Sequence, residues 1–319
     1  MRLATRRDGS RDGAVIVVSS DGTRWLSAAD LSANLQIALD DWGRIEPALK
    51  ALSARVDAGQ GQPLAAAELM APLPRSWQWL DGSAFPTHGK LMQQAFNLPP
   101  IETDRPLMYQ GMSHCFLSGT EDVAFPSETD GIDFEGEFGV ITGDVPMGCT
   151  ANDALAHVRL VVLINDWSLR AIAPIEMKTG FGWVQAKPAC SLAPFAVTPD
   201  ALGTAWKEGR VDLPLTVEVN GGWFGSPSGM AMAFGFHELI EHAARTRYLP
   251  AGTIIGSGTV SNPEHASVGS TCISEKRAID MIEGRTPKSF LKFGDRVRMS
   301  AGLIFGTIDQ CVVEQKPGL

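Results

Sequence analysis

The sequence predicts an α+β fold that is rich in β-strands, with a small N-terminal α/β domain (residues 1–70) ahead of a larger domain (residues 71–319). From residue 72 onward, short β-type runs alternate with Gly, Pro and Asn turns, whereas only residues 151–160 and 235–246 show clear helical patterns. The length of 319 residues exceeds what one small core usually needs. These observations favour one large β-rich domain and one smaller domain.

The N-terminal domain is predicted to begin with three short strands. The runs MRLATRR, AVIVVSS and TRWLSA are separated by Asp-Gly turns, which are the strongest short hairpin signal. Leucine and isoleucine then recur near helical spacing over residues 28–56, which predicts two helices interrupted around Gly43 to Pro47. Residues 57–74 are rich in Gly, Pro and Ala, and we expect them to form a linker into the larger domain.

The larger domain contains a series of strand candidates separated by turn residues. They are EFGVIT (137–142), HVRLVVLIND (157–166), LPLTVEVNGGWFG (213–225), TIIGSGTVS (253–261), DRVRMSA (295–301) and IFGTIDQCVVE (304–314). Their composition predicts a largely antiparallel sandwich or barrel.

Composition excludes several classes of protein. The net charge of −9, with no cluster of Lys and Arg, argues against a nucleic-acid partner or an anionic membrane surface. The longest apolar run, Leu160 to Ile164, is too short to span a bilayer, and the N-terminus lacks the apolar region of a signal peptide. Five scattered cysteines without a Cys-x-x-Cys pair favour a reducing cytoplasm over a disulfide framework or a zinc knuckle.

The stretch IDFEGEFGVITGD places three carboxylates at two-residue spacing: Asp133, Glu135 and Glu137. On a strand, alternate side chains share a face and stand about 7 Å apart. Closely placed carboxylates repel each other by about 4 kcal/mol in a typical protein environment. Solvent, a basic side chain or a metal ion must offset that repulsion, and a solvated strand face is the simplest reading.

A further acid changes the balance between these readings. Asp166 follows the apolar run LVVLIN, so it lies at a strand end, where an acid can enter a cleft. Together with Glu135 and Glu137 it would form an all-oxygen site suited to magnesium, manganese or calcium. Asp133 is expected to be solvated at the rim of that site.

The order of motifs DFEGEFGVITGD, INDWSLR, KPACSLAPFAV, VNGGWFG, GTIIGSGTVS and FLKFGDRV resembles the fumarylacetoacetate hydrolase family over roughly residues 72–319. The resemblance implies a fumarylacetoacetase-type mixed β-sandwich roll. It also implies that Glu135, Glu137 and Asp166 are metal ligands. Fumarylacetoacetases add an aspartate seven residues ahead of a catalytic histidine, and DGSAFPTH offers Asp81 and His88 at that spacing. The alternative reading of this segment is a simple Gly/Pro turn.

The same resemblance implies roles for residues that meet the substrate. Arg170 and Lys187 would contact substrate oxygens, and Tyr109 and Thr259 would line the substrate site. Ser83 would lie there too, at a position where fumarylacetoacetases have a tyrosine.

The partner of the catalytic histidine is displaced in this sequence. The family pattern places a glutamate where Ile273 stands, and Glu275 is the nearest acid. Since a two-residue shift along a strand preserves the face, we expect Glu275 to orient His88. Ala173 and Met177 stand where fumarylacetoacetases have polar groups, which leaves the identity of the substrate open.

By this resemblance the chain is expected to hydrolyse a carbon–carbon bond in a β-diketo acid, with a divalent cation (Mg²⁺, Ca²⁺ or Mn²⁺) as its cofactor. The cation would stabilise an enolate, and His88 would activate water. One alternative is a hydratase, decarboxylase or tautomerase that acts on a 2-oxo acid at the same metal site. Another is a catalytically silent binding protein. The expected partners are a small 2-oxo or β-diketo acid and a second copy of the chain in a homodimer.

Overall fold

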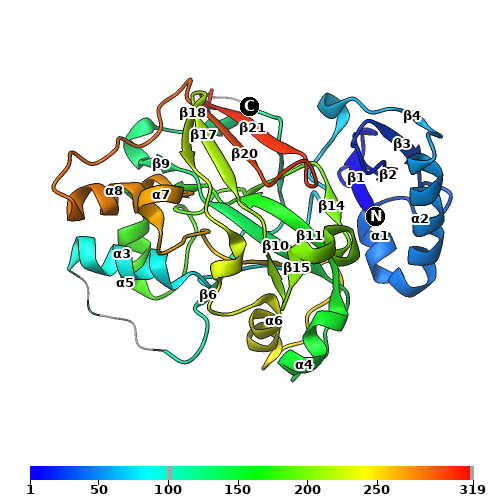
Figure 1. Cartoon of the computed structure of the whole chain (residues 1–319), viewed down its shortest axis with the longest axis horizontal. Coiled ribbons are helices and arrows are strands. Elements are labelled where there is room, and N and C mark those ends of the chain that lie inside the picture. Colours follow the sequence, from blue (N-terminus) through cyan, green and yellow to red (C-terminus); the bar gives the residue numbers. More distant parts are fainter. Residues whose placement is uncertain (98, 100–102, 317–319) are drawn as a thin grey trace.

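A computed structural model describes residues 1–97, 99 and 103–316. The chain starts with the three predicted antiparallel strands, β1 (Arg2–Arg6), β2 (Ala14–Val18) and β3 (Arg24–Ser27). Helices α1 (Leu35–Asp40) and α2 (Trp42–Asp57) pack on this small unit through buried Leu, Ile and Val side chains. Figure 1 shows the strands and both helices together at one end of the molecule.

The predicted helix break around Gly43 to Pro47 is wrong, because both residues lie inside α2. The chain breaks earlier, at Asp41, whose φ of −127° and ψ of 40° are not helical. Proline inside a helix costs about 3 kcal/mol. Ile45 and Leu49, on either side of the proline, are buried in the core, and this packing offsets the cost.

The predicted linker instead packs against the N-terminal strands. Its residues Gln62–Pro63 form β4 and pair with β3. Further along, the amide of Met70 donates to the carbonyl of Thr5 at 2.9 Å. A short 3₁₀ turn (Ala66–Glu68) comes between them. Leu69 is 1% exposed, so its apolar side chain holds the segment to the core.

The N-terminal strands continue into the main sheet of the molecule. Its order along the principal path is β4-β3-β2-β1-β14-β11-β10-β19-β5-β6. The added strands are β14 (Ala196–Val197), β11 (Val158–Asn165), β10 (Gly136–Thr142), β19 (Ile254–Gly256), β5 (Trp79–Gly82) and β6 (Met108–Gly111). Off this path, β13 (Ser191–Leu192) pairs with β11, and β7 (Leu117–Ser118) pairs with β13. Strands β10, β11 and β19 pair antiparallel, whereas β19 and β5 are parallel.

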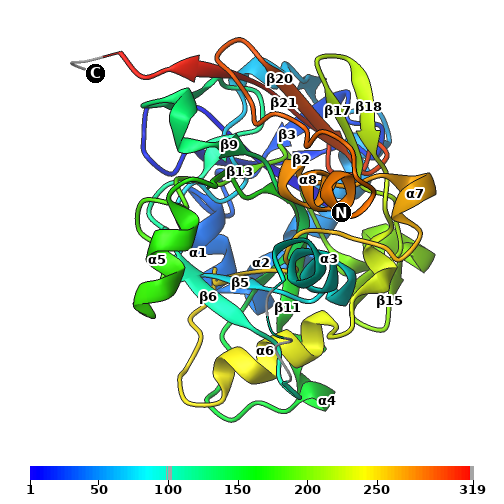
Figure 2. The same ribbon diagram turned by 90° about the vertical axis from the view of Figure 1, so that its left-hand side faces the viewer.

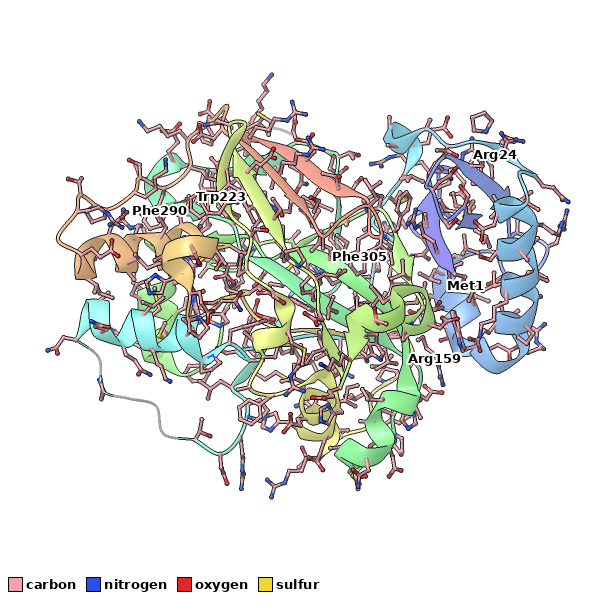
Figure 3. The ribbon with its side chains drawn as sticks, viewed as in Figure 1. Met1, Arg24, Arg159, Trp223, Phe290 and Phe305 are labelled. Atoms are coloured by element: carbon pink, nitrogen blue, oxygen red, sulfur yellow. The ribbon has the colours of Figure 1, made fainter. Side chains whose placement is uncertain are left out.

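A second, five-stranded sheet faces the main one. Its order is β18 (Gly222–Gly225), β17 (Thr216–Val219), β20 (Arg296–Ser300), β21 (Thr307–Glu314) and β8 (Val123–Phe125). Figure 2 shows β17, β18, β20 and β21 together at the top of the molecule. Phe138 from β10 meets Phe305, which lies just before β21, with ring centroids 6.0 Å apart, and Figure 3 shows Phe305 near the centre of the molecule. The predicted β-rich α+β fold is confirmed.

Two short strand pairs complete the β structure. One joins β9 (Ile132–Asp133) to β12 (Ser168–Leu169), and the other joins β15 (Trp206–Lys207) to β16 (Arg210–Val211). Three further 3₁₀ turns cover Glu128–Asp130, Pro199–Ala205 and Gly229–Ala231.

The helices lie around the sheets. They are α3 (Pro86–Phe96), α4 (Ala151–Ala154), α5 (Ala173–Thr179), α6 (Phe236–Ala244), α7 (His265–Val268) and α8 (Ile273–Ile282). The predicted helix over 235–246 is confirmed as α6. The one over 151–160 is shorter than predicted, since a 3₁₀ turn (Leu155–His157) follows α4 and the β-branched Val158 begins β11.

Helices α3 and α8 lie side by side in both views (Figures 1 and 2). Leu91 of α3 packs against Ala278 and Ile279 of α8. This contact joins two segments far apart in the sequence. In the described part of the chain, no helix has the length and apolarity needed to cross a bilayer.

Candidate active site

Three buried carboxylates meet where adjacent strands of the main sheet end. Asp81 lies on β5, Glu137 on β10, and Asp166 directly after β11. One carboxylate oxygen from each lies within 4.8 Å of the others, and the three residues are no more than 5% exposed. We call Asp81, Glu137 and Asp166 the acidic triad.

Strand pairing produces this arrangement. The antiparallel register pairs Gly136 with Asn165 and Glu137 with Ile164, so Asp166 follows across from Glu135, whose carbonyl accepts a hydrogen bond from the Asp166 amide at 2.9 Å. Asp166 therefore lies diagonally from Glu137 on the same face, while β19 separates β10 from β5. Gly256 of β19 pairs with Asp81. A Cβ atom at Gly256 would touch the Asp81 carboxylate and come within 2.9 Å of Glu137 Oε2. Glycine at this position therefore allows the two carboxylates to approach each other across β19.

The acidic triad carries more negative charge than its surroundings neutralise. Neither carboxylate oxygen of Glu137 has a hydrogen-bond partner among the residues that the structure describes. Burial, with the charges of Asp81 and Asp166, raises the pKa of Glu137 well above its usual range. Burial and the charge of Asp166 raise the pKa of Asp81 to about 8. Buried carboxylates with unused oxygens are the donor set that a hard divalent cation prefers, so the residues present fit such an ion.

Glu135 has a different environment from Glu137, although only one residue separates them. Its Oε2 accepts a hydrogen bond from Lys187 Nζ at 2.7 Å, and its Oε1 accepts one from the Arg170 guanidinium. Burial alone would raise the pKa of Glu135, but Lys187 and Arg170 outweigh burial and hold that pKa well below its usual range. The structure thus places this predicted ligand beside the triad, in an ion pair with two cations.

Lys187 bridges the two groups of carboxylates. Its Nζ also lies 2.5 Å from Asp166 Oδ2. Burial would lower the pKa of Lys187, but the charges of Asp166 and Glu135 outweigh burial and raise it, so the ammonium keeps its charge.

Asp166 has two further hydrogen-bond donors. The Tyr109 hydroxyl donates to Oδ2 at 2.7 Å, and the Cys190 thiol donates to Oδ1 at 3.0 Å. Burial and the neighbouring Asp166 raise the pKa of Cys190 well above its usual range, so the thiol stays protonated and remains a donor. The ring of Trp183 stands edge-on to Tyr109, with centroids 6.3 Å apart. The structure therefore places Tyr109 beside Asp166, whereas no sequence signal pointed to Cys190.

His88 and Glu275 form a hydrogen-bonded pair. His88 Nδ1 lies 2.9 Å from Glu275 Oε2, although the residues are 187 positions apart in the sequence. His88 is in the first turn of α3, which starts at Pro86, and its side chain is 19% exposed, whereas Glu275 is fully buried. The structure therefore brings together the two residues that were expected to pair.

The expectation that Glu275 lies on a strand is wrong, because Glu275 is the third residue of α8. The thiol of Cys272 caps this helix by accepting a hydrogen bond from the Glu275 amide at 3.2 Å. The pairing with His88 depends on the packing of α3 against α8, which is a contact between distant segments that residue spacing does not encode.

Asp133 was expected at a solvated rim, and this prediction is also wrong, because the residue is 0% exposed. It lies on β9, and its Oδ2 accepts a hydrogen bond from Arg170 Nε at 2.8 Å. The backbone amides of Ile273 and Ser274 donate to the same carboxylate at 2.7 and 2.9 Å. The alternating acids of IDFEGE were the available signal, but spacing alone does not show which acid will be buried.

The remaining predicted residues lie around these groups. Thr259 is 6% exposed and follows Gly258, whose amide donates to Asp81 Oδ1 at 3.1 Å. Ser83 follows β5 and is exposed, and its backbone lies close to Gly258. Gly258 has a φ of +76° and closely approaches the Gly82 carbonyl, a conformation that requires glycine. Ala173 begins α5, where the Met177 side chain is exposed.

Known proteins resemble the chain along most of its length. The family model described as Fumarylacetoacetase N-terminal domain 2 matches residues 1–75, and the one described as Fumarylacetoacetate (FAA) hydrolase C-terminal matches residues 78–313. The chain is 28% identical over 163 residues to 2,4-didehydro-3-deoxy-L-rhamnonate hydrolase from Sphingomonas sp. (strain SKA58), covering 50% of this chain and 54% of that protein. It thus spans about half the length of that relative.

Two other proteins extend the comparison. Over 238 residues the chain is 26% identical to oxaloacetate tautomerase YisK from Bacillus subtilis (strain 168), covering 73% of this chain and 69% of that protein. The crystal structure of maleylpyruvate hydrolase from Sphingobium sp. SYK-6, in complex with manganese (II) ion and pyruvate, superposes with a TM-score of 0.70 at 17% identity, covering 99% of this chain and 100% of that one. The shared fold and the match of the C-terminal family model to more than half of the sequence show that this chain belongs to the fumarylacetoacetate hydrolase family.

Proposed function

We propose that this chain is a metal-dependent hydrolase that cleaves a carbon–carbon bond in a β-diketo acid of the acylpyruvate or fumarylacetoacetate type. One juxtaposition carries the proposal. The acidic triad, with unused buried oxygens on Glu137, adjoins the Glu135–Arg170–Lys187 cluster. Asp133 links Arg170 to the first turn of α8, the helix that carries Glu275, and Glu275 is the partner of His88. Metal-assisted hydrolysis needs both a cation site and a group that activates water.

The acidic triad would hold the cation, with Glu135 as the further ligand that the family resemblance implies. A Mg²⁺, Mn²⁺ or Ca²⁺ ion bound there would supply Lewis-acid polarisation of the substrate's ketone oxygens. All the protein donors are oxygen atoms, which is why we propose these hard cations rather than zinc or copper.

The His88–Glu275 pair would activate the water. Since Nδ1 of His88 faces Glu275, its Nε2 is the nitrogen left to accept a proton from water. The resulting hydroxide adds to one carbonyl carbon of the substrate. The bond between that carbon and the central carbon then breaks, its electron pair forms an enolate on the departing fragment, and a proton completes the second product.

Arg170 and Lys187 would stabilise negative charge on the substrate. Both side chains are held in place by Glu135, so neither must reorganise when charge develops on a substrate oxygen. Tyr109, Thr259 and Ser83 would border the bound acid, as the family resemblance implies.

A 2-oxo acid tautomerase is the second candidate. It is favoured by the similarity to oxaloacetate tautomerase YisK, whose alignment covers 73% of this chain. Tautomerisation needs stabilisation of an enolate at the same cation site, but it needs no attacking water. The His88–Glu275 pair therefore separates the two candidates.

A spectrophotometric assay with matched variants tests the proposal. Wild-type protein, supplied in turn with Mg²⁺, Mn²⁺ or Ca²⁺, is expected to cleave acylpyruvates or fumarylacetoacetate. His88→Ala should slow cleavage by about 10²- to 10⁴-fold, the range for loss of a general base. Its metal affinity should match that of wild type, because His88 is not a proposed ligand. If wild type cleaves none of these substrates but interconverts the keto and enol forms of oxaloacetate, the tautomerase candidate replaces the hydrolase.

We also propose that the chain forms a homodimer. Four large apolar side chains, Ile175, Met177, Phe181 and Val184, are 63–97% exposed within α5 and the segment that follows it. The Glu176 carboxylate accepts hydrogen bonds from the amides of Val184, Gln185 and Ala186, which fixes the segment in this conformation. An exposed apolar surface of this kind is typical of a protein–protein interface. Sedimentation velocity should show a dimer for wild type and a monomer for Phe181→Asp, and a monomeric wild type would contradict the proposal.

A further inference from the structure

The carboxylate of Asp133 has four hydrogen-bond donors around it. Oδ1 accepts from the amides of Phe134 and Ile273, and Oδ2 accepts from the Ser274 amide and from Arg170 Nε. All four distances lie between 2.7 and 2.9 Å. A fully buried carboxylate with this many donors is held in a single orientation.

Two of these donors belong to the first turn of α8. Ile273 and Ser274 are its first two residues, and their amides have no acceptor within the helix. Negative charge at a helix N-terminus is stabilising, so Asp133 fixes the point at which α8 begins. Glu275 is the next residue along the helix, and its side chain orients His88. Asp133 therefore controls the position of Glu275 from outside the helix.

A third donor is the guanidinium of Arg170. Its Nε is bonded to Asp133, and the same guanidinium also reaches Glu135. Burial would lower the pKa of Arg170, but the charges of Glu135 and Asp133 outweigh burial and raise it. The contact with Asp133 thus orients the guanidinium and also compensates its positive charge.

We propose that Asp133 is a positioning residue that sets two working groups of the site at once, the Arg170 guanidinium and the Glu275 end of α8. This inference rests on the proposed function for the roles of Arg170, Glu275 and His88. Asp133 need not touch the substrate. The distance between the Arg170 guanidinium, which would bind the substrate, and the His88–Glu275 pair, which would activate water, then depends on this one buried carboxylate.

The test compares Asp133→Asn with wild type in the cleavage assay. An asparagine amide has one acceptor oxygen and one NH₂ donor, so in either orientation one of the two α8 amides must face a donor. When the NH₂ replaces Oδ2, Arg170 Nε faces it as well. We expect kcat/KM to fall by about 10²-fold, which is typical of a misplacement of about 1 Å. Because Arg170 would bind substrate and Glu275 would serve the chemical step, KM should rise and kcat should fall together.

Double-mutant cycles separate positioning from a general effect. Asp133→Asn should still lower kcat in an Arg170→Gln background, acting through Glu275. It should have no further effect, within about twofold, when Arg170→Gln and Glu275→Gln are combined. A loss that vanishes in the Arg170→Gln background, or persists undiminished in the combined background, would overturn the proposal.

Asp280→Asn is the matched control. Asp280 is a 4% exposed aspartate on the same helix, and its carboxylate also accepts from an arginine (Arg285 Nε, 3.0 Å) and from a backbone amide (Lys288, 3.2 Å). It has the same kinds of partner as Asp133 and no role in the proposed chemistry. If Asp133→Asn and Asp280→Asn lowered kcat/KM equally for equal losses of stability, Asp133 would be a structural residue only.

Two further measurements keep the proposal testable. If Asp133→Asn does not fold, Asp133→Glu replaces it, because it keeps the buried charge and moves it by one methylene group. That variant should lose at least about tenfold in kcat/KM, and an unchanged value would overturn the proposal. Hydrogen exchange at the amides of Ile273 and Ser274 needs no substrate. Faster exchange in the variant supports the contact with α8 even if wild type proves inactive on every β-diketo acid, and unchanged exchange overturns it.

Discussion

Two groups of buried carboxylates lie next to each other in this molecule, but their counter-charges differ. In the first group, both Asp133 and Glu135 accept hydrogen bonds from the Arg170 guanidinium, and Glu135 also accepts one from Lys187. In the second group, the acidic triad, Lys187 reaches only Asp166, and both Glu137 oxygens lack partners among the described residues. Residue type and burial are nearly the same in both groups, so the placement of two cations creates the difference.

This difference shows how neighbouring acids on one stretch of sequence can have opposite roles. A carboxylate with an internal cation is already stabilised and serves to hold that cation in place. A carboxylate without one remains a strong attractant for an ion from solution. In the metal-free protein, Asp133 and Glu135 therefore hold the protein's own positive groups, whereas Glu137 has no cationic partner within the described ranges and offers its oxygens to an external cation.

The largest expected effect on metal binding and activity comes from removing Glu137, the carboxylate with no counter-charge in the described part of the chain. Glu137→Ala should abolish binding of Mg²⁺ or Mn²⁺ and reduce activity to background, because Glu137 offers the two unused oxygens of the site. The fold should persist, because no hydrogen bond is lost. Isothermal titration calorimetry checks the affinity and circular dichroism checks the fold. Metal binding as tight as in wild type would show that Glu137 is not a ligand.

A comparison of two isosteric variants in metal-free protein sharpens the contrast between the groups. Glu135→Gln removes the carboxylate that two buried cations share, while Arg170 keeps Asp133 and Lys187 keeps Asp166. Loss of one partner of a buried hydrogen-bonded group costs about 1–3 kcal/mol, and more for charged groups. Glu137→Gln replaces a carboxyl group that has no hydrogen-bond partner among the described residues and whose pKa is raised well above its usual range by burial. The free energy of unfolding of this variant should therefore stay within about 1 kcal/mol of wild type. Urea denaturation in the presence of a chelator measures both. Equal losses in the two variants would mean that the two groups do not differ in charge balance.

The smallest expected effect is a dependence of metal-free stability on pH. The pKa of Asp81 is raised from 3.8 to about 8, so the folded state holds this proton more tightly than the unfolded chain does. The stabilisation is fully present below pH about 4 and is lost as pH rises toward about 8. The thermal midpoint of wild type, relative to Asp81→Asn, should therefore fall by several °C between pH 5 and pH 8, since 1 kcal/mol corresponds to roughly 2–4 °C.

A divalent cation provides the control for this prediction. At pH 8 it should restore the midpoint of wild type but not that of Asp81→Asn, because the ion would compensate the deprotonated carboxylate. A difference between the two proteins that does not change from pH 5 to pH 8 would show that Asp81 is not the titrating group.

Much of the site was predictable because its signals are local in the sequence. The apolar run that ends in Asn165–Asp166 forms β11, and the Asp81–His88 spacing matches the end of β5 and the first turn of α3. The N-terminal strands followed from Asp-Gly turns. In each case, a short stretch determines both the element and the place of its polar residue.

The incorrect predictions concern features that depend on contacts between distant segments. The burial of Asp133 requires the start of α8, about 140 residues away, and the helical setting of Glu275 depends on a cap by Cys272. Pro47 lies inside α2 because the packing of Ile45 and Leu49 outweighs a local preference. Spacing along the chain contains little information about such contacts.

The parallel pairing of β5 with β19 also affects when the site can fold during synthesis of the chain. Asp81 and His88 leave the ribosome well before the residues they meet, because Gly256 lies in a strand far along the chain and Glu275 follows His88 by 187 residues. Contacts of such long range form slowly, because the intervening chain must first be brought together. Asp81 and His88 therefore have no assembled site until these distant segments have been synthesised. The acidic triad and the His88–Glu275 pair form only when the whole span from β5 to α8 is available for folding.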